Sequence, residues 1–229
     1  MNAAQLLVES LGHEGVSDLF GVPGEETLGF SDALLDARTQ VVAARHEQAA
    51  AFMADVYGRV SGRAGVCFAT LGPGATNLLT GVADAYLDHA PLVAITGQAS
   101  LNRRHKESHQ SIDALAMFKP VTKWNASIPQ ADVIPEAVRK AFKIAQTEKP
   151  GATHLELPED VAEQSTDAAL RPLSVQAPVM PEPSPSQVDR AVRSIAGAKR
   201  PLILAGNGVV RRKATGGVRS FARAFQIPV

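Results

Sequence analysis

Short apolar runs alternate with longer stretches of helical periodicity along most of this chain, and this alternation restricts its fold more than any other feature. The apolar runs are four or five residues long, as buried strands usually are, and lie at 17–20, 41–44, 66–70, 92–96 and 153–157. The helical stretches lie at 3–11, 48–59, 75–87 and 135–146. Strands separated by helices predict an α/β fold in which a parallel sheet is sandwiched by helices.

Prolines accumulate in the next segment, where the periodicity of the apolar residues disappears. They are Pro172, Pro178, Pro181, Pro183 and Pro185. This composition predicts a semi-rigid linker at 163–186 between a first domain, 1–162, and a second unit, 187–229. The second unit shows helical patterns at 186–195 and 218–225 and strand patterns at 202–205 and 227–229. We expect it to be the truncated start of a second α/β domain, because a lone β-α-β unit leaves one sheet edge uncovered.

The charge balance argues against a polyanionic partner. Lysine and arginine number 23, as do aspartate and glutamate, so neither a nucleic acid nor a membrane is expected to bind. No apolar run approaches the roughly 18 residues of a membrane-spanning helix and no signal sequence is recognisable, which predicts a cytoplasmic protein. The single cysteine, Cys67, cannot form an internal disulfide and is expected to be an inert apolar residue.

A carboxylate stands between an apolar run and an alanine-rich helix. This residue, Glu47, follows the predicted strand at 41–44. Functional groups of parallel sheets gather beyond the carboxyl ends of the strands, which makes Glu47 a candidate acid. Burial there would remove its hydration and favour the protonated form, so that it could donate a proton near neutrality. The alternative is that Glu47 only complements a helix dipole, a contribution of about 0.3 to 1 kcal/mol.

Two glycine-containing turns follow predicted strands. A Gly-Pro-Gly turn lies at 72–74 and a Pro-Gly turn at 23–24. Glycine lets the backbone approach a flat ring closely and proline fixes the chain path, so both turns are candidate ligand contacts. Thr76 and Asn77 open the next helix and would line the same cleft. The alternative is an ordinary strand-to-helix turn with Thr76 or Asn77 as the cap.

Five motifs occur in a characteristic order and spacing. They are FGVPG at 20–24, RHEQAA at 45–50, LGPGATN at 71–77, ITGQ at 95–98 and LELPEDV at 155–161. Together they resemble the pyrimidine-binding domain of thiamine diphosphate enzymes, most closely that of the acetolactate synthase large subunit. The resemblance covers residues 1–161, and the second unit is similar to the start of that family's central domain. Each motif alone is weak, whereas five in register are specific.

The resemblance implies a role for each motif. Glu47 would hydrogen-bond N1′ of the aminopyrimidine of thiamine diphosphate and favour the imino tautomer, which takes the proton from thiazolium C2. Pyruvate is then decarboxylated, and the hydroxyethyl unit is joined to a second 2-oxo acid. Gln110 is implied to reach the substrate from the partner subunit, so the implied catalytic residues are Glu47 and Gln110. The implied cofactor contacts are Pro23, Gly24, Glu47, Gly72, Pro73, Gly74, Thr76 and Asn77.

The chain departs from the family pattern in several places. Glu25 stands where many members have a second glycine, so Glu25 and Glu26 are also interpreted as caps of the next helix. His109 stands where many biosynthetic members carry phenylalanine, which is more like the catabolic, flavin-independent branch; the alternative is an exposed loop histidine. The segment 206–211 lacks the third glycine of a dinucleotide-binding fingerprint, so it does not predict a nucleotide site. FAD is an additional candidate cofactor only because the central domain of the resembled family can hold one.

The expected function is therefore that of the N-terminal portion of an acetolactate synthase-like carboligase, inactive alone. The family binds Mg²⁺ and the diphosphate through a C-terminal domain, so no metal ligands are expected here. The resemblance implies a homodimer or homotetramer and allows a regulatory subunit. The alternatives are another thiamine diphosphate enzyme, of the sulfoacetaldehyde acetyltransferase or benzoylformate decarboxylase type, a non-catalytic module of the same fold, and an unrelated nucleotide-binding domain.

Overall fold

The computed structural model describes residues 1–176 and 181–229. The chain divides into two compact units, Met1–Val179 and Met180–Val229, each with its own architecture. Part of the expected linker, 177–180 with Pro178, lies outside the described residues. None of the helices in the described ranges is long and apolar enough to cross a membrane.

The first unit is built on a parallel sheet. Among the described residues it has six strands in the order β2-β1-β3-β4-β6-β5, and every neighbouring pair is parallel. The bounds are β1 Asp18–Gly21, β2 Gln40–Ala43, β3 Gly65–Ala69, β4 Leu92–Gln98, β5 Trp124–Ser127 and β6 Ala152–Pro158. The predicted α/β fold is confirmed, and each strand predicted in this domain is present.

Strand β5 is the one that the sequence pattern does not reveal. It is an edge strand that pairs only with β6, and its four residues are all half-buried. Because an edge strand of this kind needs no continuous apolar run, Trp124-Asn125-Ala126-Ser127 gives no strand signal.

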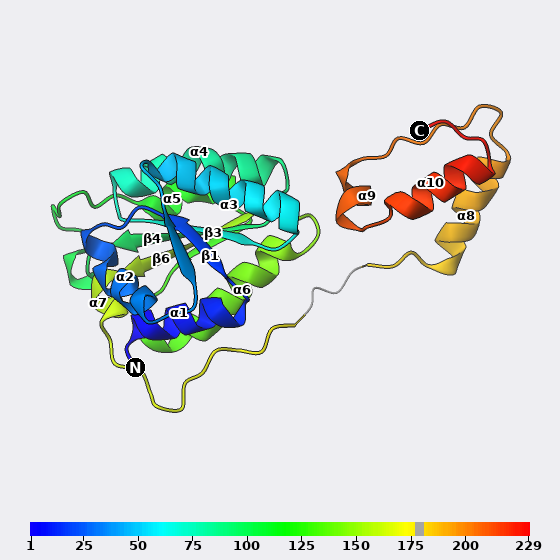
Figure 1. The fold of residues 1–229 in the computed structure, drawn as a ribbon. Helices are drawn as coiled ribbons and strands as arrows, with labels where there is room; N and C mark the ends of the chain where they lie inside the picture. Colours follow the sequence, from blue (N-terminus) through cyan, green and yellow to red (C-terminus); the bar gives the residue numbers. More distant parts are fainter. Residues whose placement is uncertain (177–180) are drawn as a thin grey trace. The chain divides into compact units, whose positions relative to one another are not determined.

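Helices cover both faces of the sheet. Figure 1 shows α3 and α4 on one face and α1, α2 and α6 on the other. The bounds are α1 Ala3–His13, α2 Leu28–Leu35, α3 Glu47–Ser61, α4 Pro73–Leu87, α5 Ala114–Phe118, α6 Ile134–Gln146 and α7 Glu159–Ala162. Short 3₁₀ helices are η1 Glu25–Thr27, η2 Leu101–Arg103, η3 Lys119–Val121 and η4 Ala131–Val133.

Strand β3 shows how the two layers of the core are built. Val66 and Phe68 face the layer of α1, α2 and α6, whereas Cys67 and Ala69 face the layer of α3 and α4. This follows from the alternation of side chains along a strand. Cys67 is fully buried, and desolvation raises the pKa of its thiol far above the ordinary value, which agrees with the inert role expected for it.

The sheet order places a topological switch point between β1 and β3. Strand β1 pairs with β2 on one side and with β3 on the other. In a parallel α/β sheet the loops leave in opposite directions at such a point and open a crevice beyond the carboxyl ends of the strands. The loops that follow β1, β2 and β3 all meet at this edge.

The first residues of the expected linker are held against the first unit. The amide of Ala3 donates to the carbonyl of Gln164 at 2.8 Å, and Asn2 forms an isolated antiparallel bridge with Ser165. Leu170 packs against the core layer that includes residues of α1, α2 and α6. The boundaries 1–162, 163–186 and 187–229 stay predictions.

The second unit consists of helices joined by irregular segments. Within 181–229 these are α8 Pro185–Ala196, α9 Asn207–Arg211 and α10 Thr215–Ala224. The strands predicted at 202–205 and 227–229 are wrong as regular strands, because a single backbone hydrogen bond, from Ile203 to the carbonyl of Pro228 at 2.9 Å, joins the two segments.

A buried histidine in β6 gives the first unit a pH-dependent stability. His154 is fully buried, stacks on Phe118 with 4.0 Å between ring centroids, and lies 2.8 Å from the hydroxyl of Thr96 through Nε2. Burial lowers the pKa of His154 from 6.5 to about 3. The native protein therefore holds this ring neutral over a range in which the unfolded chain binds a proton.

We expect the free energy of unfolding to fall as the pH drops below 6.5, by about 1.4 kcal/mol per pH unit from this residue until roughly pH 3. Urea titrations between pH 7 and pH 4 measure the slope. His154→Gln is the comparison, because an amide cannot titrate and still offers a polar partner to Thr96. Equal slopes for the two proteins would contradict the assignment.

Candidate functional site

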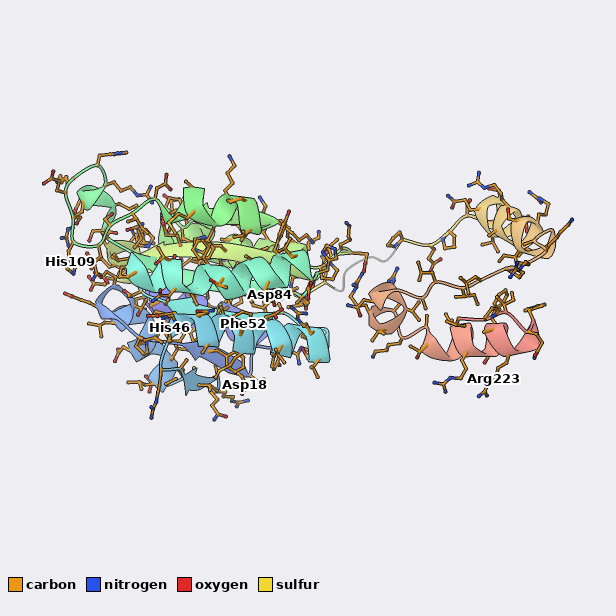
Figure 2. All side chains as sticks on the ribbon, turned by 90° about the horizontal axis from the view of Figure 1, so that it is seen from above. Asp18, His46, Phe52, Asp84, His109 and Arg223 are labelled. Carbon is orange, nitrogen blue, oxygen red and sulfur yellow. The ribbon has the colours of Figure 1, made fainter. Side chains whose placement is uncertain are left out.

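The loops after β1, β2 and β3 form one contiguous polar site at the carboxyl edge of the sheet. In Figure 2, His46 and His109 both lie at one end of the first unit, whereas Asp84 lies further along α4. His46 precedes α3, and its Nδ1 accepts from the amide of Gln48 at 3.2 Å, which caps that helix. The cap fixes Glu47 as the first residue of α3.

The carboxylate of Glu47 faces the first turns of α4. Its Oε2 accepts a hydrogen bond of 2.9 Å from Nδ2 of Asn77. A methyl group placed on Gly74 would lie 3.6 Å from Oε1. Glu47 and Asn77 are both half-buried rather than enclosed. The bond from Asn77 leaves Oε1 without a hydrogen bond among the described contacts and oriented toward the glycine turn.

Gly72 forms the sharp bend between β3 and α4. Its backbone has φ +55° and ψ −119°, a combination that L residues rarely adopt. Pro73 then stands at the first position of α4, where its missing N–H costs nothing. A Cβ at Gly72 would overlap the carbonyl oxygen of Gln110 and lie 2.8 Å from the Cβ of that residue. Glycine is therefore required by conformation and by the loop that packs against it.

Thr70 connects the two glycine turns. A Cβ at Gly24 would lie 2.5 Å from the Cβ of Thr70, and one at Gly74 would lie 2.9 Å from its Cγ2. The hydroxyl of Thr70 donates to Oε2 of Glu26 at 2.7 Å. The turns at β1 and β3 therefore meet across the switch point, with Thr70 between them.

Sequence reasoning missed Thr70 and Glu26 as members of the site. The sequence pattern puts Thr70 at the end of an apolar strand and favours Glu26 as a cap of the next helix. Glu26 lies in η1 and directs its carboxylate to Thr70, whereas Glu25 is exposed. A signal was present, since a hydroxyl that directly follows a buried parallel strand stands at the functional edge.

The remaining predicted residues lie in the same turns, and they differ in exposure and in their hydrogen bonds. The hydroxyl of Thr76 donates to the carbonyl of Pro73 at 2.9 Å, so it is satisfied within its own helix. Pro23, Pro73 and Thr76 are exposed. Gln110 is exposed and has φ +53°, with its backbone packed on Gly72. The structure thus brings Gln110 to the glycine turn of its own chain.

A short basic run at 103–106 follows β4, and its two arginines contact carboxylates of the first unit. Arg104 lies 3.5 Å from the buried carboxylate of Glu156 and donates to the hydroxyl of Ser127 at 2.7 Å. Arg103 lies 3.8 Å from Glu159. His105, Lys106 and His109 are exposed. Both arginine side chains are therefore paired with carboxylates while they remain exposed.

Two family models match parts of this chain. Residues 1–117 match the family model described as thiamine pyrophosphate enzyme, N-terminal TPP binding domain, and residues 188–229 match the model of the central domain of the same enzymes. Thiamine pyrophosphate is the compound called thiamine diphosphate above. The first match contains Glu47, the glycine turn and Gln110.

Individual relatives carry consistent names. The chain is 42% identical over its whole length to a probable acetolactate synthase large subunit of Methanocaldococcus jannaschii, of which it covers 40%. It is 38% identical to an acetolactate synthase of Bacillus subtilis, with 98% of this chain and 39% of the relative aligned. It is 38% identical to a catabolic acetolactate synthase of Raoultella terrigena, with 90% and 36% aligned. The chain thus spans about two-fifths of the relatives' length, and it belongs to the thiamine pyrophosphate enzyme family.

Proposed function

We propose that the protein carrying this chain is an acetolactate synthase-like carboligase that decarboxylates pyruvate and joins the two-carbon unit to a second 2-oxo acid. The observation that carries the proposal is the placement of Glu47. Its carboxylate is oriented by Asn77 and faces Gly74 at the switch point of the sheet. The names of the relatives support the same reaction.

The residues present fit the pyrimidine half of thiamine diphosphate. Gly24 and Gly74 both pack against Thr70 more closely than a residue with a side chain could, which brings the two turns together at the edge of the sheet where a flat ring would bind. Glu47 offers a carboxylate oxygen, Oε1, next to the second of these turns. When bound, the cofactor supplies a nucleophilic carbon and an electron sink for the decarboxylation.

The protein's own contribution is to hold a proton where the cofactor needs it. Oε1 of Glu47 would share a proton with a ring nitrogen, while Asn77 prevents the carboxylate from rotating away by binding Oε2. A positioned acid of this type contributes roughly 10² to 10⁴ in rate. Gln110, held on the Gly72 turn, would contact the substrate. Pro23, Gly24 and the turn at 72–74 with Thr76 would lie next to the bound cofactor.

The proposal extends to a larger assembly. In this chain alone, Glu47 is only half-buried and Gln110 is exposed. A second protein surface is therefore needed to exclude water from the site. A homodimer or homotetramer would supply that surface. Mg²⁺ and the diphosphate would be held by residues other than these, and FAD would belong to the central domain if it is present.

A direct assay tests the function. The full-length protein, supplied with pyruvate, Mg²⁺ and thiamine diphosphate, is expected to form 2-acetolactate, and to form none when the thiamine diphosphate is omitted. Calorimetric titration with thiamine diphosphate should show binding. Turnover of sulfoacetaldehyde or benzoylformate without acetolactate would favour the related enzymes, and binding without any turnover would favour a non-catalytic module. Absence of binding would contradict the whole proposal.

A further inference from the structure

Two buried polar side chains at the ends of β4 and β6 form a hydrogen-bonded pair that the proposed chemistry does not use. Gln98 is 7% exposed and Glu156 is 3% exposed. Nε2 of Gln98 donates to Oε2 of Glu156 at 3.0 Å. The other oxygen of Glu156 lies 3.5 Å from Arg104, so the carboxylate is paired on both sides. Buried groups of this kind are costly unless satisfied, and here both are.

The pair is connected to the loop that carries Gln110. Nε2 of Gln98 also donates to the carbonyl of Ile112 at 3.1 Å, and its Oε1 accepts from the hydroxyl of Ser111 at 3.4 Å. The same oxygen accepts from the amide of Ala99 at 2.9 Å, which fixes the side-chain amide at the start of the loop. One side chain therefore joins both ends of the segment 99–112.

The loop in turn rests on the glycine turn of the site. Gln110 holds a left-handed backbone with φ +53°, and its backbone and Cβ pack against Gly72. A non-glycine residue in that conformation persists only where its neighbours determine it. A backbone bond of 3.2 Å from Ser111 to the carbonyl of Ser108 spans Gln110, and the bonds of Ser111 and Ile112 to Gln98 tie this turn to the end of β4.

We infer that Gln98 and Glu156 are positioning residues for Gln110. Glu156, anchored by Arg104, orients the amide of Gln98, and Gln98 holds residues 111–112 so that Gln110 lies on Gly72, in the glycine turn whose Gly74 faces the Glu47 carboxylate. Neither residue needs to touch the substrate. This inference rests on the proposed function, because it gives Gln110 its place in the reaction.

The test is a double-mutant cycle in the full-length protein. Gln98→Ala is expected to lower kcat/KM for pyruvate about 10- to 100-fold, since a misplaced contact group costs about that much. In a Gln110→Ala background the same change should cost less than about twofold, because its target is already gone. Glu156→Gln should retain most activity, since a glutamine oxygen can still accept from Gln98, whereas Glu156→Ala should behave like Gln98→Ala.

Hydrogen exchange gives a readout that does not depend on turnover. Amides of residues 108–113 should exchange faster in Gln98→Ala than in the unmodified protein, whether or not pyruvate is the substrate. Gln146→Ala is the matched control, because that amide also donates to a carbonyl, of Phe142 at 3.2 Å, and accepts from a backbone amide, of Ala64 at 3.4 Å, at the opposite end of the sheet. It should leave both readouts unchanged.

Two results would overturn the inference. One is equal loss of kcat/KM from Gln98→Ala with and without Gln110, which would mean that Gln98 acts independently of it. The other is unchanged exchange at 108–113 in Gln98→Ala. A protein that forms no acetolactate would contradict the proposed function instead, and the exchange experiment would still decide whether Gln98 holds the loop.

Discussion

Replacing Glu47 by glutamine is expected to abolish most of the acetolactate synthesis of the full-length protein without unfolding it. The loss should be about 10² to 10⁴ in kcat, which is the range for a positioned acid or base. Glutamine retains an oxygen that can accept the bond from Asn77, so the geometry of the α3 and α4 termini is preserved. What disappears is the ability to share a proton with the cofactor.

The measurement separates this role from the ordinary role of an acidic residue at a helix terminus. Glu136 stands in the first turn of α6 as Glu47 stands in that of α3, and it is exposed. Glu136→Gln therefore reports the dipole contribution alone, about 0.3 to 1 kcal/mol of stability, and should leave kcat unchanged. Turnover and urea unfolding of the two variants are compared side by side. Full turnover in Glu47→Gln would remove Glu47 from the mechanism.

Much of the first unit was predictable from the sequence because its elements carry strong local signals. Buried parallel strands such as β3 read as continuous apolar runs, and Pro73 marks the start of α4. The position of Glu47 at the edge of the sheet followed from this periodicity. The resemblance then supplied the chemistry, which no count of apolar residues contains.

The errors have physical causes as well. Strand β5 is half-buried at the edge of the sheet, so it needed no apolar run, and the segments around Ile203 and Pro228 show apolar runs without forming a ladder. The bond between Thr70 and Glu26 joins residues 44 positions apart, and that between Gln98 and Glu156 joins residues 58 apart. Long-range pairs of this kind depend on the order of the strands, which the sequence pattern does not encode.

Replacing Gly72 by alanine is expected to damage both the fold and the site. A side chain at φ +55° and ψ −119° costs about 1 to 3 kcal/mol in backbone strain. The added methyl group would also overlap the carbonyl of Gln110, and backbone cannot rotate away as a flexible side chain would. We expect the free energy of unfolding to fall by roughly 3 kcal/mol or more, and kcat/KM to fall about 100-fold because Gln110 is displaced.

Gly62→Ala is the control that separates the cost of the left-handed backbone from the cost of the contact with Gln110. Gly62 ends α3 with φ +71°, and a Cβ there would meet nothing within 4 Å. Its replacement should cost only the left-handed conformation, roughly 1 to 2 kcal/mol, with no change in kcat/KM. Denaturant titration of both variants gives the difference between them, which measures the contact of Gly72 with Gln110. If Gly72→Ala cost no more stability than Gly62→Ala and kept full activity, the loop could not be resting on the glycine turn, and the link between the turn and the substrate residue would fail.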